Sequence, residues 1–176
     1  MKVAISGRAG SGTSTTAEKV AKKLGMEFIG AGDIFRRMAK QKNMSLQEFG
    51  KYAEKNPEID KEIDQKQREI SQKREKIVIE GRLAGWMAEA DIKIWLKAPL
   101  KLRAKRVAKR DQITHEKALK RIQKREKSEK KRYKKFYDIN IYDKSIYGLI
   151  IDTSKWNQNS VVEIIEKSIK NFSNET

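Results

Sequence analysis

Residues 7–15 have the types and the spacing that bind a phosphate group. Gly7 and Gly12 are the fixed glycines of the pattern G-x-x-x-x-G-x-[ST], and Ser14 is its hydroxyl. Glycine lets the backbone turn tightly and bring its N–H groups against a phosphate. A helix that starts directly after the loop adds unpaired N–H groups and the positive end of its dipole. The predicted phosphate-binding residues are Gly7, Arg8, Ala9, Gly10, Ser11, Gly12, Thr13, Ser14 and Thr15.

Two positions of this loop decide its charge balance. Ser14 stands where a hydroxyl ligates the Mg²⁺ of a bound nucleotide, so it is the predicted metal ligand. Thr13 stands where lysine is usual, so the point charge for the outer phosphates is missing and must come from elsewhere in the chain. The alternative is a turn of small residues without a ligand. The apolar strand before the loop and the register of Ser14 disfavour that alternative.

The segment from Lys117 to Lys135 is strongly basic, with eleven basic and two acidic residues. Arg121, Arg125 and Arg132 are spaced by four and seven, which places all three on one face of a helix. The planar guanidinium group suits phosphate oxygens. We therefore predict a mobile helical arm that closes over a polyphosphate, with little apolar burial to hold it; a solvated face is the alternative for its lysines.

Phosphoryl transfer depends on positioning and charge neutralisation more than on covalent chemistry. The predicted catalytic residues are Arg121, Arg125, Arg132 and Ser14. No nucleophilic triad is evident, and the lone His115 is interpreted as a surface or capping residue rather than a general base.

The elements that must position these residues follow from short apolar runs. Predicted strands at residues 3–5, 26–30, 77–79, 92–96 and 149–153 alternate with helices, which indicates an α/β fold with a parallel sheet of about five strands and helices on both faces. Ligands bind beyond the carboxyl ends of such strands. The phosphate loop and the polar segments 32–33 and 80–82 all fall at that edge.

Several helices have predicted faces and ends. Asp33 is expected to cap a helix, Ser45 and Glu48 to form a capping box, and Leu46 to lie on the same face as Phe49. Residues 58–74 are expected to form a largely exposed helix, and residues 83–90 a short one. In the helix after Pro99, basic residues are expected to point outward: Arg103, Arg106, Lys109 and Arg110. The tail after Phe172 is expected to fray.

Composition narrows the class of protein. The chain has 176 residues, enough for one domain with a sizeable core, and no cysteine, which excludes disulfides and thiolate metal sites. No segment approaches the ~20 apolar residues of a membrane span or resembles a signal peptide, so a cytoplasmic protein is expected. The net charge of +17 suits an anionic partner. Lysine supplies 29 of the 41 basic residues, and lysine richness with abundant glutamate is also found in hyperthermophile proteins.

Four motifs resemble those of nucleoside monophosphate kinases. Ala31-Gly32-Asp33-Ile34-Phe35-Arg36 is similar to their A/T-G-D-x-x-R element, and Glu80-Gly81-Arg82 to the E/D-G-R of cytidylate kinases. Arg125-Glu126-x-x-Glu129-x-x-Arg132 is similar to the R-D-x-x-D-x-x-R lid motif, with both aspartates replaced by glutamate. Arg106-Val-Ala-Lys-Arg110 is similar to a donor-side arginine pair. The likeness to the archaeal type of cytidylate kinase covers nearly the whole chain, including segments 44–54, 56–60, 80–87 and 128–133.

This resemblance implies a single P-loop kinase domain over residues 1–176, built as a three-layer sandwich. Residues 30–75 would supply the helices that bind the nucleoside monophosphate, and residues 112–137 an arginine-rich helical lid. The implied reaction is ATP- and Mg²⁺-dependent phosphorylation of CMP, and of dCMP as well, to the diphosphate. The implied donor-binding residues are Arg106 and Arg110. The implied substrate-binding residues are Gly32, Asp33, Arg36, Gly81, Arg82 and Glu129, the last accepting a hydrogen bond from the cytosine amine.

Two other functions stay open at this point. One is a kinase for AMP or another small acceptor on the same fold. The other is an RNA-binding protein with a P-loop, which predicts steeply salt-dependent binding. Aromatic residues are few in the basic segment before Tyr133, so no stacking platform is evident and nucleic-acid binding is not expected. The expected partners are small nucleotides alone, without a membrane, and the expected state is a monomer.

Overall fold

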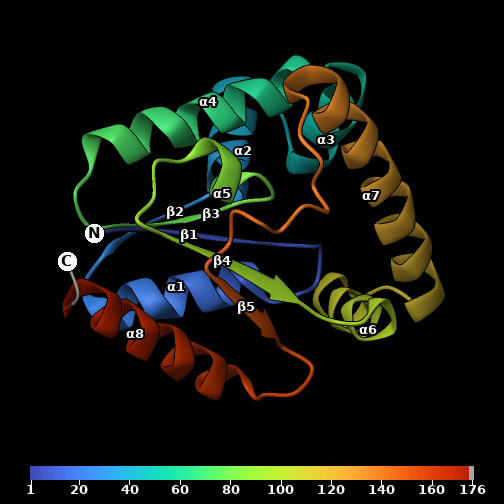
Figure 1. Cartoon of the computed structure of the whole chain (residues 1–176). Helices are drawn as coiled ribbons and strands as arrows, with labels where there is room; N and C mark the ends of the chain where they lie inside the picture. The colour runs from blue at the N-terminus through green and yellow to red at the C-terminus, as the bar shows by residue number, and fades with distance from the viewer. Residues whose placement is uncertain (175–176) are drawn as a thin grey trace.

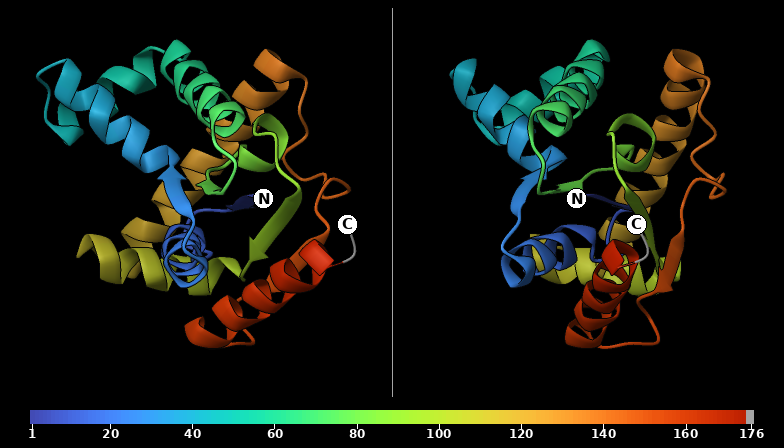
Figure 2. Two further views of the ribbon diagram at one scale, coloured as in Figure 1. Left: turned by 90° about the vertical axis from the view of Figure 1, so that its left-hand side faces the viewer. Right: turned by 60° about the vertical axis from the view of Figure 1, so that its left-hand side comes forward.

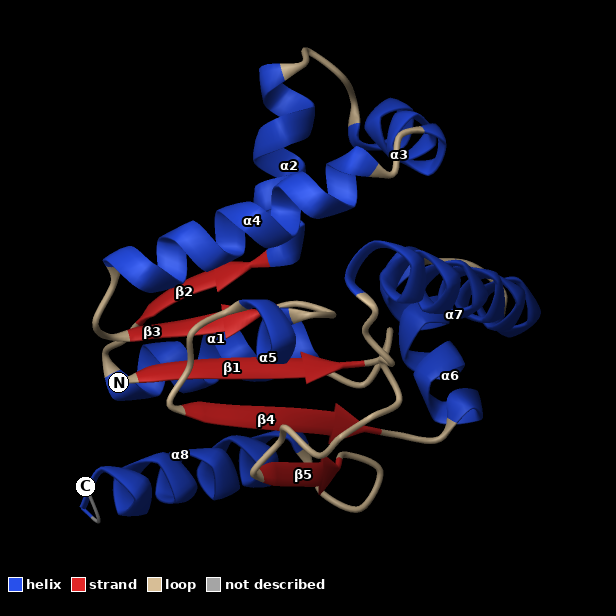
Figure 3. Ribbon diagram, turned by 45° about the horizontal axis from the view of Figure 1, so that its top comes forward, coloured by secondary structure: helices blue, strands red, loops and turns tan. Residues whose placement is uncertain are grey.

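Five parallel strands form one sheet in the computed structural model, which describes residues 1–174 (Figures 1 and 3). Their order is β2-β3-β1-β4-β5, with β1 in the centre. The bounds are Lys2–Gly7 for β1, Glu27–Gly30 for β2, Ile77–Glu80 for β3, Ile92–Lys97 for β4 and Leu149–Asp152 for β5. Val3 is in register with Val78 on one side and with Ile92 on the other. The predicted α/β fold with a five-stranded parallel sheet is confirmed.

Helices cover both faces of this sheet (Figure 2). The helices α1, Thr13–Leu24, and α8, Gln158–Asn174, pack on one face. The opposite face carries α2, Ala31–Gln41; α3, Leu46–Lys55; α4, Glu58–Lys73; and α5, Ala84–Met87. The helices α6, Leu100–Asp111, and α7, His115–Tyr137, stand beyond the carboxyl ends of the strands (Figure 3).

The two cores follow from the alternation of side chains along a strand. Val3 and Ile5 of β1 pack with α1 and α8, whereas Ala4 between them packs with α2 and α3 on the other face. All three side chains are fully buried, because a central parallel strand is covered on both faces. This burial fixes the position of Gly7, the last residue of β1 and the first of the phosphate loop.

Some predicted bounds and faces are wrong. The helix α4 is not largely exposed, because Ile59, Ile63 and Gln67 are buried in it. Leu46 is 53% exposed, although the capping box of Ser45 and Glu48 next to it forms as predicted. The helix α5 is shorter than residues 83–90. Fraying was expected after Phe172, but the last helix continues to Asn174; the rest of that tail, residues 175–176, lies outside the described part of the chain.

Within residues 1–174, no helix combines the length and the apolar character that a bilayer crossing requires.

Candidate active site

The phosphate loop joins β1 to α1 and packs against α6. Gly10 and Gly12 have φ angles of 80° and 93°, a left-handed backbone that favours glycine. A Cβ atom on Gly10 would lie 2.6 Å from the carbonyl oxygen of Arg103. Gly12 is the N-cap residue of α1, so Ser14 and Thr15 lie in the first helical turn, where their side chains are exposed. The loop therefore has the strand, glycine turn and helix that the sequence predicts.

The side chain of Thr13 is bound to Glu80 at the end of β3. The Thr13 hydroxyl donates to Oε1 of Glu80 at 2.7 Å. Burial raises the pKa of Glu80, while the hydroxyls of Thr13 and Ser14 and the charge of Arg82 act in the opposite direction. The oxygen atoms of Ser14 and Glu80 thus lie next to each other beside the phosphate loop, and such a donor set fits Mg²⁺. No cluster of three or more His, Cys, Asp or Glu side chains stands ready for a metal among residues 1–174, so nucleotide phosphates would have to supply further ligands.

Arg103 lies beneath the loop, and the prediction that it points outward is wrong. Its side chain is 2% exposed. Its guanidinium donates to the carbonyl oxygens of Ala98 at 3.0 Å and Ala9 at 3.1 Å, and to Oε1 of Glu126 at 2.6 Å. A charged group is buried in proteins when it is paired and hydrogen-bonded, and Arg103 meets both conditions.

The two arginines implied on the donor side lie in different places. Arg106 donates to the hydroxyl and the carbonyl oxygen of Thr153, both at 2.8 Å, and the Thr153 hydroxyl donates to Ser11 O at 2.9 Å. Arg106 is therefore next to the loop. Arg110 pairs with Asp111 at 2.7 Å, and its side chain is 69% exposed. The structure does not bring Arg110 to the loop.

Arg82 connects the loop to α7. Its guanidinium donates to the carbonyl oxygen of Gly7, and its Nε lies 3.0 Å from Oε2 of Glu129. Arg125 donates to the other carboxylate oxygen of Glu129 at 2.7 Å. Burial opposes ionisation of Glu129, but the two guanidinium groups outweigh it and lower the pKa of this carboxyl. Glu129 is thus a buried carboxylate held between two arginines.

The residues implied for the acceptor lie where β2 and β3 end. Asp33 caps α2 from its third position rather than from the position before the helix, because its carboxylate accepts the N–H of Gly30 at 3.1 Å. Arg36 pairs with Asp33 at 2.7 Å and is 58% exposed, and Gly32 lies in the same first turn. Gly81 packs against Gln67, whose amide donates to Glu80 O at 2.6 Å.

The three arginines of α7 share a helix but bind separate partners. Arg121 pairs with Asp111 of α6 at 2.9 Å, Arg125 with Glu129, and Arg132 with Asp60 of α4 at 2.8 Å. Tyr137, the last residue of α7, donates to Asp64 of α4 at 3.0 Å. In this conformation the three guanidinium groups are not gathered at one point.

The expectation that little apolar burial holds this arm is wrong. Ala118 and Ile122 are fully buried against Ala104 and Val107 of α6. Farther along α7, Tyr133 packs with Leu83 and Ile141. His115 is an exposed residue at the start of α7, as expected, and Thr114 before it is the N-cap. The arm is therefore packed against the body along both halves of its length.

The family model described as the cytidylate kinase-like family matches residues 2–155. The chain belongs to this family. It is 53% identical over 168 residues to the cytidylate kinase of Pyrococcus horikoshii, and this alignment covers 95% of the present chain and 87% of the relative. It is 49% identical over 177 residues to the cytidylate kinase of Methanocaldococcus jannaschii, covering 98% and 99%.

Solved kinase structures share the fold. A shikimate kinase from Bacteroides thetaiotaomicron superposes with a TM-score of 0.64 at 13% identity, covering 97% of this chain and 98% of that one. Deoxyadenosine kinase from M. mycoides with bound dATP has a TM-score of 0.56 at 19% identity, covering 97% and 100%. The resemblance read from the sequence is thus confirmed. This member of the cytidylate kinase-like family is a nucleoside monophosphate kinase, and nucleotides are its substrates.

Two side chains at the site of this family member were not predicted: Arg103 and Thr153. The lid motif includes Glu126, but the sequence did not indicate its ion pair with Arg103. A signal for Arg103 exists, because it stands three residues after Leu100 and four before Val107, on the inner face of α6. Thr153 has no comparable signal in the sequence.

Proposed function

We propose that the protein transfers the γ-phosphoryl group of ATP to CMP, and to dCMP, in the presence of Mg²⁺. The observation that carries this proposal is the position of Arg82. One guanidinium group binds the first residue of the phosphate loop and a carboxylate of the arginine-rich helix, so donor and acceptor elements meet at a single side chain. The names of the relatives, cytidylate kinases, support cytidine as the acceptor nucleoside.

The donor would lie on the loop. The N–H groups of residues 8–15 and the start of α1 hold its phosphates, and Arg106 stands beside them. Ser14 and Glu80 would hold Mg²⁺, which neutralises phosphate charge when bound. In the reaction an oxygen of the acceptor phosphate bonds to the γ-phosphorus as the bond from that phosphorus to the bridging oxygen breaks. ADP leaves with the bridging oxygen.

The acceptor phosphate would bind Arg36 and Arg82. Arg36 is exposed and pairs with Asp33, so a dianionic phosphate can compete for it. Gly32, Asp33 and Gly81 would line the acceptor site beside these two arginines. Glu129, a carboxylate at neutral pH, would accept a hydrogen bond from the exocyclic amine of cytosine.

The arginines of α7 would stabilise the charge that develops during transfer. Arg121, Arg125 and Arg132 each bind a carboxylate here, and phosphate oxygens can replace those carboxylates. Residues 112–137 would act as the lid and residues 30–75 as the acceptor-binding helices of one domain. Arg110 would come to the donor side only after a movement of the lid. The protein would act as a monomer.

The test is a coupled kinase assay with ATP and, separately, CMP, dCMP, UMP and AMP. We expect the highest kcat/KM with CMP and dCMP, and loss of turnover when Mg²⁺ is chelated. A clear preference for AMP would instead establish the alternative acceptor on the same fold.

A further inference from the structure

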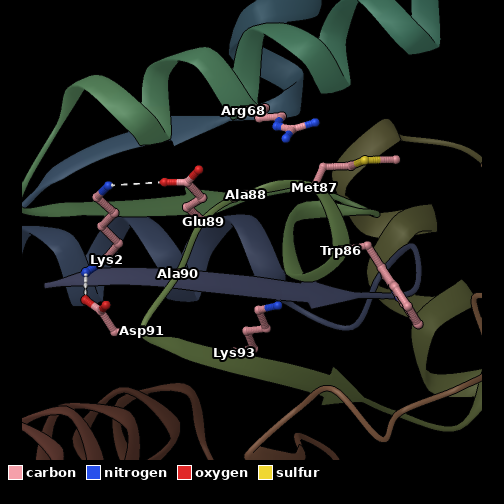
Figure 4. A pocket seen from close by; sticks show the side chains of 9 residues that line it. All are labelled: Lys2, Arg68, Trp86, Met87, Ala88, Glu89, Ala90, Asp91 and Lys93. Carbon is pink, nitrogen blue, oxygen red and sulfur yellow. Dashed lines mark hydrogen bonds and ion pairs between the residues drawn. The ribbon is translucent and has the colours of Figure 1, made fainter.

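A pocket of about 580 Å³ lies on the face of the sheet that α4 and α5 cover, and it extends from Lys2 at the start of β1 to Trp86 of α5 (Figure 4). Its walls come from the start of β1, the start of β4, the helix α4 and the segment from Trp86 to Asp91. Lys2 is the first residue of β1 and Lys93 the second of β4, whereas the carboxyl ends of these strands, Gly7 and Lys97, lie at the site described above. Its volume falls within the roughly 300–1,000 Å³ of cavities that bind small molecules.

The acidic groups of this pocket already have partners. Glu89 accepts the amide of Gln72 at 3.0 Å and lies 3.9 Å from the ammonium group of Lys2. Asp91 accepts the backbone N–H of Lys2 at 2.7 Å and lies 3.7 Å from the N-terminal ammonium. Both carboxylates therefore already have cationic partners and do not balance the charge of a further cation in the pocket.

Two cations of the pocket have no such partner. Among the side chains that the structure describes, neither the guanidinium of Arg68 nor the ammonium of Lys93 makes a hydrogen bond or an ion pair. This differs from the arginines of the active site, such as Arg82 and Arg103, which bind carboxylates or backbone carbonyls. Figure 4 shows Arg68 projecting from α4 above the pocket and Lys93 from β4 below it. The uncompensated charge of the pocket is therefore positive.

The remaining wall is apolar and partly aromatic. Trp86 and Met87 follow one another in α5, and both are half-buried and line the pocket. An indole ring stacks on the flat face of a nucleobase, and a thioether packs against it. Guanidinium groups prefer phosphate oxygens.

We propose that this pocket binds a second nucleotide, whose phosphates lie between Arg68 and Lys93 and whose base packs on Trp86 and Met87. The pocket is separate from the phosphate loop, so this nucleotide is neither the phosphoryl donor nor the acceptor. The proposal does not depend on which monophosphate the enzyme phosphorylates.

The experiment is a calorimetric titration with CTP as the probe. The full-length protein is first saturated with a bisubstrate analogue that joins adenosine to cytidine through phosphates, which blocks the proposed active site. We expect one further CTP to bind per chain, and binding to weaken at least tenfold in the R68E/K93E variant and in Trp86→Ala. The control variant K109E/K167E carries the same change of net charge on exposed lysines of α6 and α8. It should bind CTP as the parent does.

Each outcome has a definite meaning. No additional CTP on the saturated protein, or equal binding by R68E/K93E and its control, would overturn the proposal. Inorganic phosphate that binds as tightly as CTP would overturn the nucleotide assignment, because the aromatic wall would then contribute nothing. If circular dichroism shows that R68E/K93E does not fold, Arg68→Ala, which removes an exposed side chain, replaces it. Failure of the analogue itself to bind would count against the proposed function, and CTP sites would then be counted on the free protein.

Discussion

The guanidinium of Arg103 and the carboxylate of Glu126 lie 2.6 Å apart and join α6 to α7 beneath the phosphate loop. Arg103 also holds the carbonyl oxygen of Ala9 in that loop, and Arg8 lies 3.7 Å from the second oxygen of Glu126. A buried ion pair thus links the residues that would hold the donor to the arm that would cover it. We therefore expect a movement of α7 near Glu126 to disturb the loop through these bonds.

Arg103→Met should lower the free energy of unfolding by about 3 kcal/mol, because it leaves the largely buried Glu126 carboxylate with the more distant Arg8, 3.7 Å away, in place of its 2.6 Å contact with Arg103. Denaturant unfolding followed by circular dichroism measures the change. Lys105→Met, an exposed position on the same helix, is the matched control and should change stability by less than about 0.5 kcal/mol. Equal effects of the two variants would show that the buried pair does not stabilise the fold.

Arg36→Ala should weaken binding of the acceptor and leave the donor almost unaffected. A hydrogen bond to a charged group contributes about 1.5–3 kcal/mol, which corresponds to a roughly ten- to hundredfold higher KM for CMP. Initial rates with each substrate varied in turn separate the two constants. The neighbouring Arg37→Ala, at an exposed position, serves as the control. A rise in the KM for ATP alone would mean that donor and acceptor sites are assigned the wrong way round.

Arg125→Ala should raise the barrier to phosphoryl transfer by about 3–4 kcal/mol, roughly a hundred- to a thousandfold in kcat. Thr13→Lys should partly restore the rate, because an ammonium group beside Glu80 supplies the charge that the loop lacks. The kcat values of the two single variants and the double variant form a cycle that measures their coupling. Strictly additive effects would rule out compensation between α7 and Thr13.

The free energy of unfolding should depend on pH through Asp64. Burial raises the pKa of Asp64 to about 7, and the nearby charge of Asp60 adds to this rise. The hydrogen bond from Tyr137 and the charge of Arg132 act in the opposite direction and lower the pKa, but they do not outweigh the burial. This value lies above the ~3.9 of an unfolded aspartate, so the folded protein binds more protons between about pH 4 and 7. The stability that Asp64 contributes therefore falls as the pH rises through this window.

Asp64→Asn removes that titration and keeps an acceptor for Tyr137. Relative to the parent, the variant should gain on the order of 2–4 kcal/mol between pH 4.5 and pH 8. Unfolding curves of both proteins at the two pH values give this difference. Parallel pH profiles for parent and variant would mean that Asp64 ionises normally in the folded protein.

The sequence predicts the sheet and the loop well because their signals are local. Short apolar runs define the five strands, and the spacing of Gly7, Gly12 and Ser14 defines the turn between β1 and α1. The inward position of Arg103 was missed because six of the twelve residues of α6 are basic, and charge suggested exposure for all of them. The contacts of α7 with Asp60 and Asp64 join residues about 70 positions apart. Periodicity within one helix carries no information about such pairs.

The first half of α7 packs against α6, and residues near its end form an ion pair and a hydrogen bond with α4. Its 23 residues make a rigid rod about 34 Å long. Such a rod acts as a lever, because a tilt of about 10° at the α6 end displaces the Tyr137 end by roughly 6 Å. That displacement exceeds the reach of both the Arg132–Asp60 and the Tyr137–Asp64 contacts. A small adjustment beneath the loop is therefore sufficient to release α4 at the far end of the arm.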